Sequence, residues 1–203
     1  MLPSFLGKKG YRQHEYRSAQ AASAVARVSV PGISRRTTGR KLMANFYKDV
    51  IRADARFNSV ELINAVDLLE PTMRAKVKSI IDDAKAYGLD FMVFETFRSA
   101  ARQKKLYDQG ATQLKKVGVH NYGLACDIVK SINGQPSWKG DFSLLGRLAQ
   151  QHGLIWGGDW GRPDLPHSFV DAVHVQWCSI SRQAALFRGT WYPVEGYDPY
   201  ADL

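Results

Sequence analysis

The sequence has few cysteines and no long apolar run. Cys126 and Cys178 are the only two cysteines, which is too few for a disulfide framework and fits synthesis in a reducing compartment. No stretch of about 18 apolar residues is present, which argues against a transmembrane helix. The N-terminal residues lack the apolar stretch of a secretory signal peptide. We therefore expect a protein made in the cytoplasm without such a signal.

The positive charge is concentrated at one end of the chain. The 203 residues carry a formal net charge of +9, with 28 basic and 19 acidic residues. Residues 1–42 contain nine Lys or Arg and one Glu, so the rest of the chain, with 19 basic and 18 acidic residues, is nearly neutral. This split predicts a basic, flexible segment over residues 1–45 and one folded domain over residues 46–203.

The basic segment allows two interpretations. A solvated leader is one, and translation from Met43 would remove it. Attraction to an anionic wall polymer or membrane surface is the other. Specific nucleic-acid binding is not expected, because the body is nearly neutral and nucleic-acid binding depends on a basic surface. We expect a monomer.

Alternating patterns predict an α+β domain with a small, mainly antiparallel sheet and flanking helices. Helices are expected after Pro71, after Ser99 and over 142–152, each followed by a glycine at 88, 110 or 153. A further short helix is expected over 181–187. Strands are expected over 89–97, 122–132, 154–156 and 172–177, with a turn at Asn133-Gly134 after the second of them.

His120 and Asp127 stand at either end of a glycine-containing turn that leads into an apolar strand. Residues seven apart on an unbroken strand face opposite sides, but the turn at 121–123 can bring the two side chains together. A carboxylate inside the apolar run 124–129 is costly unless it is paired or binds a cation. The alternative is an Asp held by backbone amides or by an arginine.

Asp171 and His174 lie at the start of a later apolar strand. Together, His120, Asp127 and His174 form a three-ligand set that suits Zn²⁺ and leaves a fourth position open. Asp171 would then be available as a general base. The alternative is an ordinary turn aspartate.

Arg98 follows the predicted strand 89–97. Alternation places Arg98 on the face of Phe94 and Thr96, opposite Glu95. It could bind a carboxylate or stabilise an oxyanion. A plain surface arginine is the alternative.

Four stretches in this order resemble the M15 zinc peptidases: ETFRSAARQKKLYDQG, HNYGLACDIV, GLIWGGDW and VDAVHVQW. This family includes D-alanyl-D-alanine carboxypeptidases and the bacteriophage endolysins that cut the L-alanyl-D-glutamate bond of peptidoglycan. The spacing of His120, Asp127, Asp171 and His174 matches the family pattern, over about residues 68–177. The segments WGGDW and LYDQG are more similar to the endolysin branch.

The sequence departs from the family pattern in three places. Gly118 stands where many members have Ser, and Cys126 precedes the ligand Asp127, where we expect it to point away from the metal. The segment 161–168, which contains His167, is longer than usual.

The resemblance implies a Hedgehog/DD-peptidase-like fold and zinc-dependent hydrolysis of the peptidoglycan stem peptide. Zinc would be held by His120, Asp127 and His174, with Asp171 as general base and Arg98 stabilising the oxyanion. The resemblance also points to Gln103, Asp159 and Trp160 as substrate-binding candidates, with Gln103 orienting either substrate or Arg98.

Three functional interpretations stay open. The first is a phage-type endolysin that cuts the L-alanyl-D-glutamate bond and reaches the wall from the cytoplasm through a holin or within a virion. The second is a D-alanyl-D-alanine carboxypeptidase. The third is a zinc-containing wall-binding module without turnover, which would have no need of Asp171.

Overall fold

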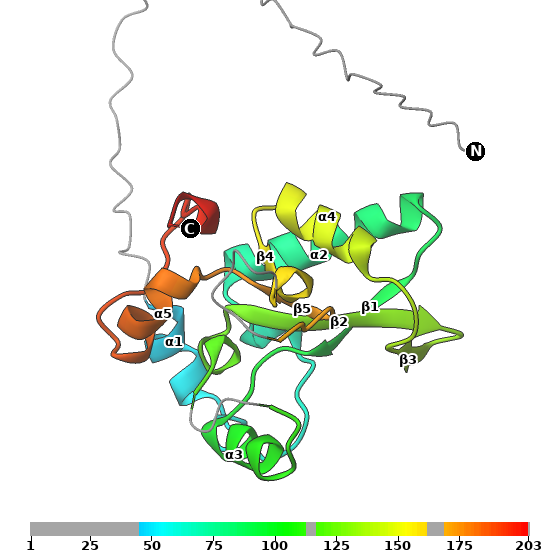
Figure 1. Cartoon of the computed structure of the whole chain (residues 1–203). Coiled ribbons are helices and arrows are strands. Elements are labelled where there is room, and N and C mark those ends of the chain that lie inside the picture. Colours follow the sequence, from blue (N-terminus) through cyan, green and yellow to red (C-terminus); the bar gives the residue numbers. More distant parts are fainter. Residues whose placement is uncertain (1–44, 113–116, 162–168, 203) are drawn as a thin grey trace, which may run out of the picture. The chain divides into compact units, whose positions relative to one another are not determined.

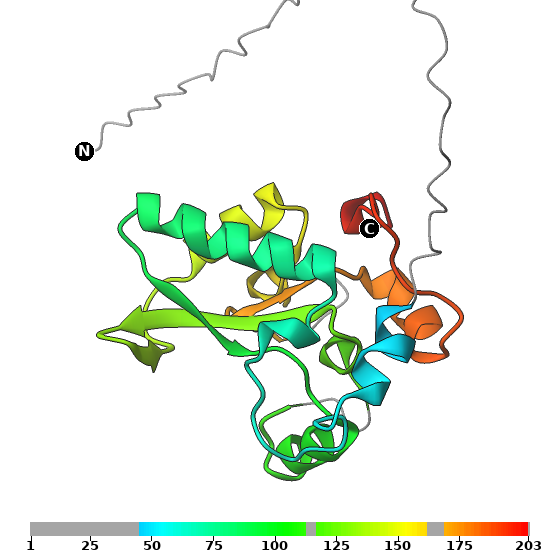
Figure 2. The same ribbon diagram turned by 180° about the vertical axis from the view of Figure 1, so that it is seen from behind.

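The chain folds around a five-stranded sheet with helices on both sides (Figures 1 and 2). The computed structural model describes residues 45–112, 117–161 and 169–202. The predicted basic segment lies outside these residues apart from Asn45, and so does His167. No helix within the described ranges is long and apolar enough to cross a membrane.

The elements follow one another in a mixed order. The α-helices are α1 (Phe46–Asp49), α2 (Pro71–Ala86), α3 (Ala100–Asp108), α4 (Ser143–Gln151) and α5 (Ile180–Phe187). The strands are β1 (Phe91–Glu95), β2 (Ala125–Ile132), β3 (Gln135–Ser137), β4 (Ile155–Trp156) and β5 (His174–Gln176). Short 3-10 helices are η1 (Ile51–Ala53), η2 (Val66–Leu68), η3 (Val119–Tyr122), η4 (Gly157–Asp159) and η5 (Pro199–Asp202).

The predicted fold class is confirmed. The strand order is β1-β2-β5-β4, with β3 paired to β2, and every pairing is antiparallel. The Asn133-Gly134 turn joins β2 to β3, and both residues have positive φ (52° and 76°), as a two-residue hairpin requires. Sequence analysis missed β3, because Gln-Pro-Ser has low strand propensity.

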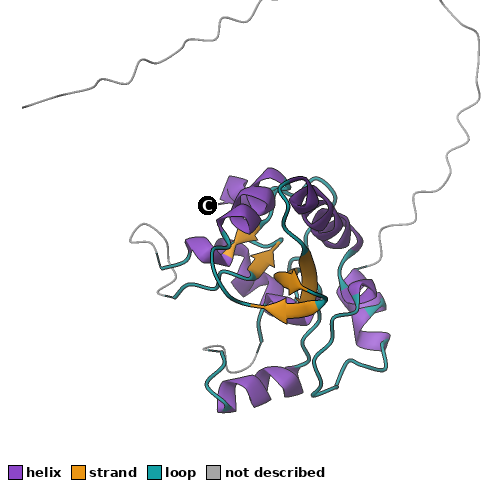
Figure 3. Cartoon of the chain, turned by 90° about the vertical axis from the view of Figure 1, so that its right-hand side faces the viewer, coloured by secondary structure: helices purple, strands orange, loops and turns teal. Residues whose placement is uncertain are grey.

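One face of the sheet carries the main hydrophobic core. Helices α2 and α4 cover this face (Figure 1), and Figure 3 shows the strands enclosed by helices. Glu70 caps α2 by accepting from the backbone N–H groups of Thr72 and Met73. The core side chains come from α2, α4 and alternate residues of β2: Met73, Val77, Ile80, Leu144, Leu145, Leu148, Cys126 and Ile128. Cys126 therefore points into the core, as predicted.

The opposite face of β2 carries Asp127. Because side chains alternate along a strand, Asp127 and Val129 face away from Cys126 and Ile128. Asp127 pairs with Glu95 of β1 and with His174 of β5. The fold thus places polar residues of three strands on the side of the sheet not covered by α2 and α4.

Gly123 fixes the turn between η3 and β2. Its φ is +70°, and a Cβ there would lie 2.6 Å from the Leu68 carbonyl oxygen and 2.8 Å from Ile51 Cδ1. Its own carbonyl accepts from the N–H of Glu70 at 2.9 Å. Only glycine fits this close backbone contact, which holds His120 beside the start of β2.

We expect Gly123→Ala to lower the free energy of unfolding by more than about 2 kcal/mol, because it combines left-handed strain with a clash against backbone. Gly88→Ala is the matched control: its φ is +71°, but nothing lies within 4 Å of its Cβ position. Urea denaturation of both variants separates the two contributions. Equal losses would show that the clash at Gly123 is relieved without cost.

Candidate metal centre

His120, Asp127 and His174 converge on one point. His120 Nε2 lies 3.2 Å from Asp127 Oδ1 and 3.1 Å from His174 Nδ1, and His174 Nδ1 lies 3.1 Å from Asp127 Oδ1. All three residues are buried. Four ligands about 2.0 Å from a tetrahedral Zn²⁺ lie about 3.3 Å apart, so the spacing of these three atoms fits such an ion.

In each imidazole, the outer nitrogen, which is the one that points away from the other two candidate ligands, contacts an oxygen atom. His120 Nδ1 lies 2.7 Å from the Thr96 carbonyl oxygen, and His174 Nε2 lies 3.1 Å from Gln176 Oε1. Since carbonyl and amide oxygens only accept, these ring nitrogens must carry the protons. Gln176 is itself oriented, because its side-chain amide donates to the Cys178 carbonyl.

The inner atoms therefore all carry lone pairs. With the outer nitrogens protonated, His120 Nε2, His174 Nδ1 and Asp127 Oδ1 face one another as acceptors, which is unfavourable without positive charge between them. Burial opposes protonation of His174, but the hydrogen bond and charge of Asp127 outweigh it and raise the pKa of His174. These three residues fit a metal cation by the chemistry of the donor set, and they form a group that could hold one.

Arg98 binds the other oxygen of Asp127. Its guanidinium donates to Asp127 Oδ2 at 3.2 Å and to Glu95 Oε2 from Nε at 2.9 Å. Gln103 Oε1 accepts from Arg98 Nη1 at 3.4 Å. Arg98 thus fixes the carboxylate so that Oδ1 faces the histidines, and Gln103 contacts Arg98.

The expectation that Arg98 and Glu95 occupy opposite faces is wrong. The register of β1 against β2 shifts between Val93 and Glu95. This bulge adds one residue to β1 and ends regular alternation, so Glu95 turns towards Arg98 and Arg102, whose Nε lies 2.8 Å from Glu95 Oε1. Sequence analysis also missed Gln176, although its place two residues after His174 puts both on one face of β5.

Asp171 is half-buried at the turn before β5. Its backbone N–H donates to the Gly157 carbonyl at 2.9 Å, and its carbonyl accepts from the His174 N–H at 3.2 Å. A Cβ on Gly157 would lie 2.5 Å from the Asp171 carbonyl oxygen, so this contact needs glycine. Burial raises the pKa of Asp171, although the nearby His174 charge opposes the rise.

Trp160 and Asp159, the other two candidates for substrate binding, have different surroundings. Trp160 is buried, and its ring centroid lies 5.0 Å from that of His174. It therefore packs beside His174, one of the candidate ligands. Asp159 is exposed at the end of η4, and its charge contributes to the raised pKa of Tyr200.

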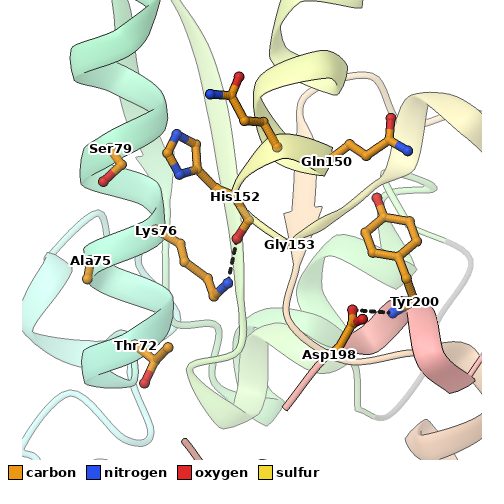
Figure 4. A pocket seen from close by; sticks show the side chains of 10 residues that line it. Thr72, Ala75, Lys76, Ser79, Gln150, His152, Gly153, Asp198 and Tyr200 are labelled. Atoms are coloured by element: carbon orange, nitrogen blue, oxygen red, sulfur yellow. Dashed lines mark hydrogen bonds between the residues drawn. The ribbon is translucent and has the colours of Figure 1, made fainter. Parts of the chain in front are cut away.

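A polar cavity of about 640 Å³ lies elsewhere in the domain. It is lined by residues of α2, the end of α4 and the C-terminal segment (Figure 4). Lys76 donates to the His152 carbonyl there, and burial lowers the pKa of Lys76. None of the predicted site residues lines this cavity, so it is separate from the metal centre.

Several known proteins have sequences similar to this chain. The chain is 30% identical over 119 residues to the peptidoglycan L-alanyl-D-glutamate endopeptidase CwlK of Bacillus subtilis (strain 168), covering 49% of this chain and 71% of that protein. A family described as D-alanyl-D-alanine carboxypeptidase matches residues 112–177, which include all three candidate ligands and Asp171. The chain belongs to the M15 peptidase family.

Two further relatives of this M15 peptidase were found. The L-alanyl-D-glutamate peptidase of Listeria phage A118 is 28% identical over 115 residues, covering 55% of this chain and 38% of that protein. The crystal structure of the Serratia marcescens L-Ala D-Glu endopeptidase ChiX matches with 25% identity and a TM-score of 0.43, covering 58% of this chain and 90% of that chain.

We expect Gln176→Leu to weaken zinc binding by about 10- to 100-fold, because the outer N–H of His174 loses the acceptor that fixes its tautomer. His120→Ala and His174→Ala should lose stoichiometric zinc altogether. Gln150→Leu, an exposed change on α4, is the control for the lost amide. Titration against a competing chelator measures each affinity, and wild-type affinity in Gln176→Leu would contradict this role.

Proposed function

We propose that this M15 peptidase is a zinc-dependent peptidoglycan hydrolase that cleaves the L-alanyl-D-glutamate bond of the stem peptide. The buried His–Asp–His group, with its three inward lone pairs, is the observation that carries the proposal. The names of CwlK and of the phage peptidase support the choice of bond.

His120, Asp127 and His174 would hold the zinc ion. When bound, zinc supplies a Lewis acid that lowers the pKa of a water molecule and polarises the scissile carbonyl. Arg98 and Glu95 keep Asp127 in its ligating orientation through the contacts described above.

Asp171 is proposed as the general base. Its half-buried carboxyl group lies where the charges of His174 and Asp127 act on it, yet it is outside the ligand group. It would accept a proton from the attacking water and then donate it to the leaving amine. A raised pKa favours the second step, because the protonated carboxyl must form readily at the pH of the reaction.

Arg98 also retains a donor for the substrate. Its guanidinium has five N–H groups, and the contacts within the described ranges use four: two to Glu95, one to Asp127 and one to Gln103. The remaining N–H on Nη1 could stabilise the tetrahedral oxyanion. Gln103 would then orient the Arg98 guanidinium. Trp160 and Asp159 are proposed to contact the substrate.

A D-alanyl-D-alanine carboxypeptidase is the second candidate, favoured by the description of the family that matches residues 112–177. The two reactions give different products from one stem peptide. Cleavage at L-alanyl-D-glutamate exposes a new D-glutamyl amine, whereas the carboxypeptidase releases a single D-alanine. Mass spectrometry of the products separates them.

The phage-type role is part of the proposal. The relative from Listeria phage A118 supports a phage endolysin, and we propose that it reaches the cell wall after release through a holin or from a virion. The basic residues 1–42 would favour anionic wall or membrane surfaces. A bacteriolytic effect on intact cells would follow from wall cleavage.

Asp171→Asn should retain zinc but lose about 10²- to 10⁴-fold in turnover, because no group then accepts the proton of the attacking water. Asp82→Asn, on the exposed side of α2, is the control and should keep wild-type activity. Zinc content and the release of new amines from purified peptidoglycan are the two measurements. Near wild-type turnover in zinc-loaded Asp171→Asn would exclude Asp171 as the base and require another group in that role.

A further inference from the structure

The bulge in β1 places two residues on the metal-centre face of the sheet. Val93 pairs with Ile128 and Glu95 pairs with Asp127, so Phe94 and Glu95 together oppose Asp127. Glu95 faces Arg98 and the metal centre. Phe94 extends from the same point of the strand but belongs to neither hydrophobic core cluster.

Trp138 meets Phe94 across β2. Trp138 directly follows β3, where Ser137 pairs with Lys130 of β2, and β1 lies on the other side of β2. The two ring centroids are nevertheless 4.7 Å apart, with the planes at 84°. Because β2 lies between β1 and β3, the Phe94 and Trp138 rings can be in contact only if both lie over the same face of β2.

That face is the one that carries the metal centre. Lys130 lies over the Phe142 ring on the α4 side, at 4.9 Å, so its neighbour in the strand, Val129, faces the other way with Asp127. In Figure 1, β3 also bends towards the side of the sheet opposite α2 and α4. Val129 is two residues from Asp127, about 7 Å along the strand, so the aromatic pair lies close to the candidate ligands.

Trp138 offers a large apolar surface to solvent. It is 50% exposed, while Trp160 and Trp177 are 6% and 1% exposed. Its edge contact with Phe94 fixes one side of the indole ring and leaves a broad area open. On the same face of β2, Ser131 alternates with Lys130 and is partly exposed, whereas Gln135 and Ser137 pair with Ile132 and Lys130 and face the other side.

An indole ring that is half exposed beside a polar residue such as Ser131 suits a sugar ring. The C–H groups on one face of a pyranose pack against an aromatic plane, while its hydroxyl and acetamido groups bond to a polar rim. In peptidoglycan the L-alanyl residue of the stem peptide is joined to an amino sugar of the glycan strand. A sugar therefore lies one residue from the bond that the proposed function cleaves.

We propose that Trp138, supported by Phe94, is a stacking platform for the N-acetylated amino sugar that carries the stem peptide. This inference rests on the proposed function for the identity of the substrate. The platform makes this M15 peptidase select peptides that are still attached to the glycan strand.

A second protein chain fits this surface less well. Ile132 is 53% exposed on the same hairpin, but it alternates with Ile128 and Lys130 and so faces away from Trp138. The apolar area of the hairpin is thus divided between two faces. Each part is small beside the roughly 800 Å² per partner of a stable protein interface.

The test compares two substrates that differ only in the sugar. One is a soluble disaccharide-peptide released from peptidoglycan by a muramidase, and the other is the same peptide without sugar. Trp138→Ala should raise KM for the disaccharide-peptide about tenfold with kcat unchanged, and should leave KM for the free peptide within about twofold of wild type. Trp138→Phe should recover part of the loss, because it keeps a ring.

Tyr87→Ala is the matched control, since Tyr87 is 63% exposed directly after α2, which packs on the opposite face of the sheet. Equal rises in KM on both substrates would overturn the proposal, because Trp138 would then contact the peptide or shape the fold. Unchanged KM on both would also overturn it.

A binding measurement keeps the inference separate from catalysis. In an NMR titration with the free disaccharide, the indole N–H signal that Trp138→Phe removes should shift, and the sugar-free peptide should not shift it. If the wild-type protein cleaves neither substrate, the proposed function fails. The titration then tests by itself whether Trp138 binds the sugar. An indole signal that does not move at saturating disaccharide overturns it.

Discussion

The candidate metal centre depends on two hydrogen bonds that point away from it. The Thr96 carbonyl and the Gln176 side chain each take the outer N–H of one histidine. These bonds decide which nitrogen of each ring is deprotonated, and the third ligand is fixed in the same manner by Arg98. Without them, rotation or tautomer exchange would remove the inward lone pairs even with all three ligands in place.

The supports come from parts of the chain that the sheet brings together. Thr96 follows β1, Gln176 lies in β5, and Asp127 lies in β2 between these strands. The bulge in β1 matters to both sides of the centre, because it turns Glu95 to the guanidinium of Arg98 and Phe94 to Trp138. One extra residue in β1 thus helps to orient the candidate ligand Asp127, through Glu95 and Arg98, and also supports the exposed ring of Trp138, through Phe94.

The grouping of the candidate ligands could be predicted from sequence because their chemistry conflicts with their surroundings. A carboxylate within an apolar strand and buried imidazoles beside it are costly unless they bind something, and His120 of η3, Asp127 of β2 and His174 of β5 do meet in the structure. The helices, the Asn133-Gly134 turn and the antiparallel sheet followed from periodicity and turn chemistry. Arg98 was singled out, and an arginine partner for Asp127 was one alternative, but Glu95 was placed opposite Arg98, since alternation assumes an unbroken strand. No sequence pattern indicated the strand β3. The position of Gln176, two residues after His174, is informative only once His174 is considered as a ligand. No sequence rule indicated that Trp138 lies above β2, because that contact joins β1 to a residue 44 positions later.

The distance in sequence between the ligands has a mechanical consequence. His120 and His174 are 54 residues apart, and β5, which carries His174, is a strand of only three residues. An ion shared by both would act as a cross-link that closes this long loop and anchors the short strand to its neighbour. Metal binding and the pairing of β5 would therefore be coupled, and loss of a bound ion would also loosen the segment that holds Asp171.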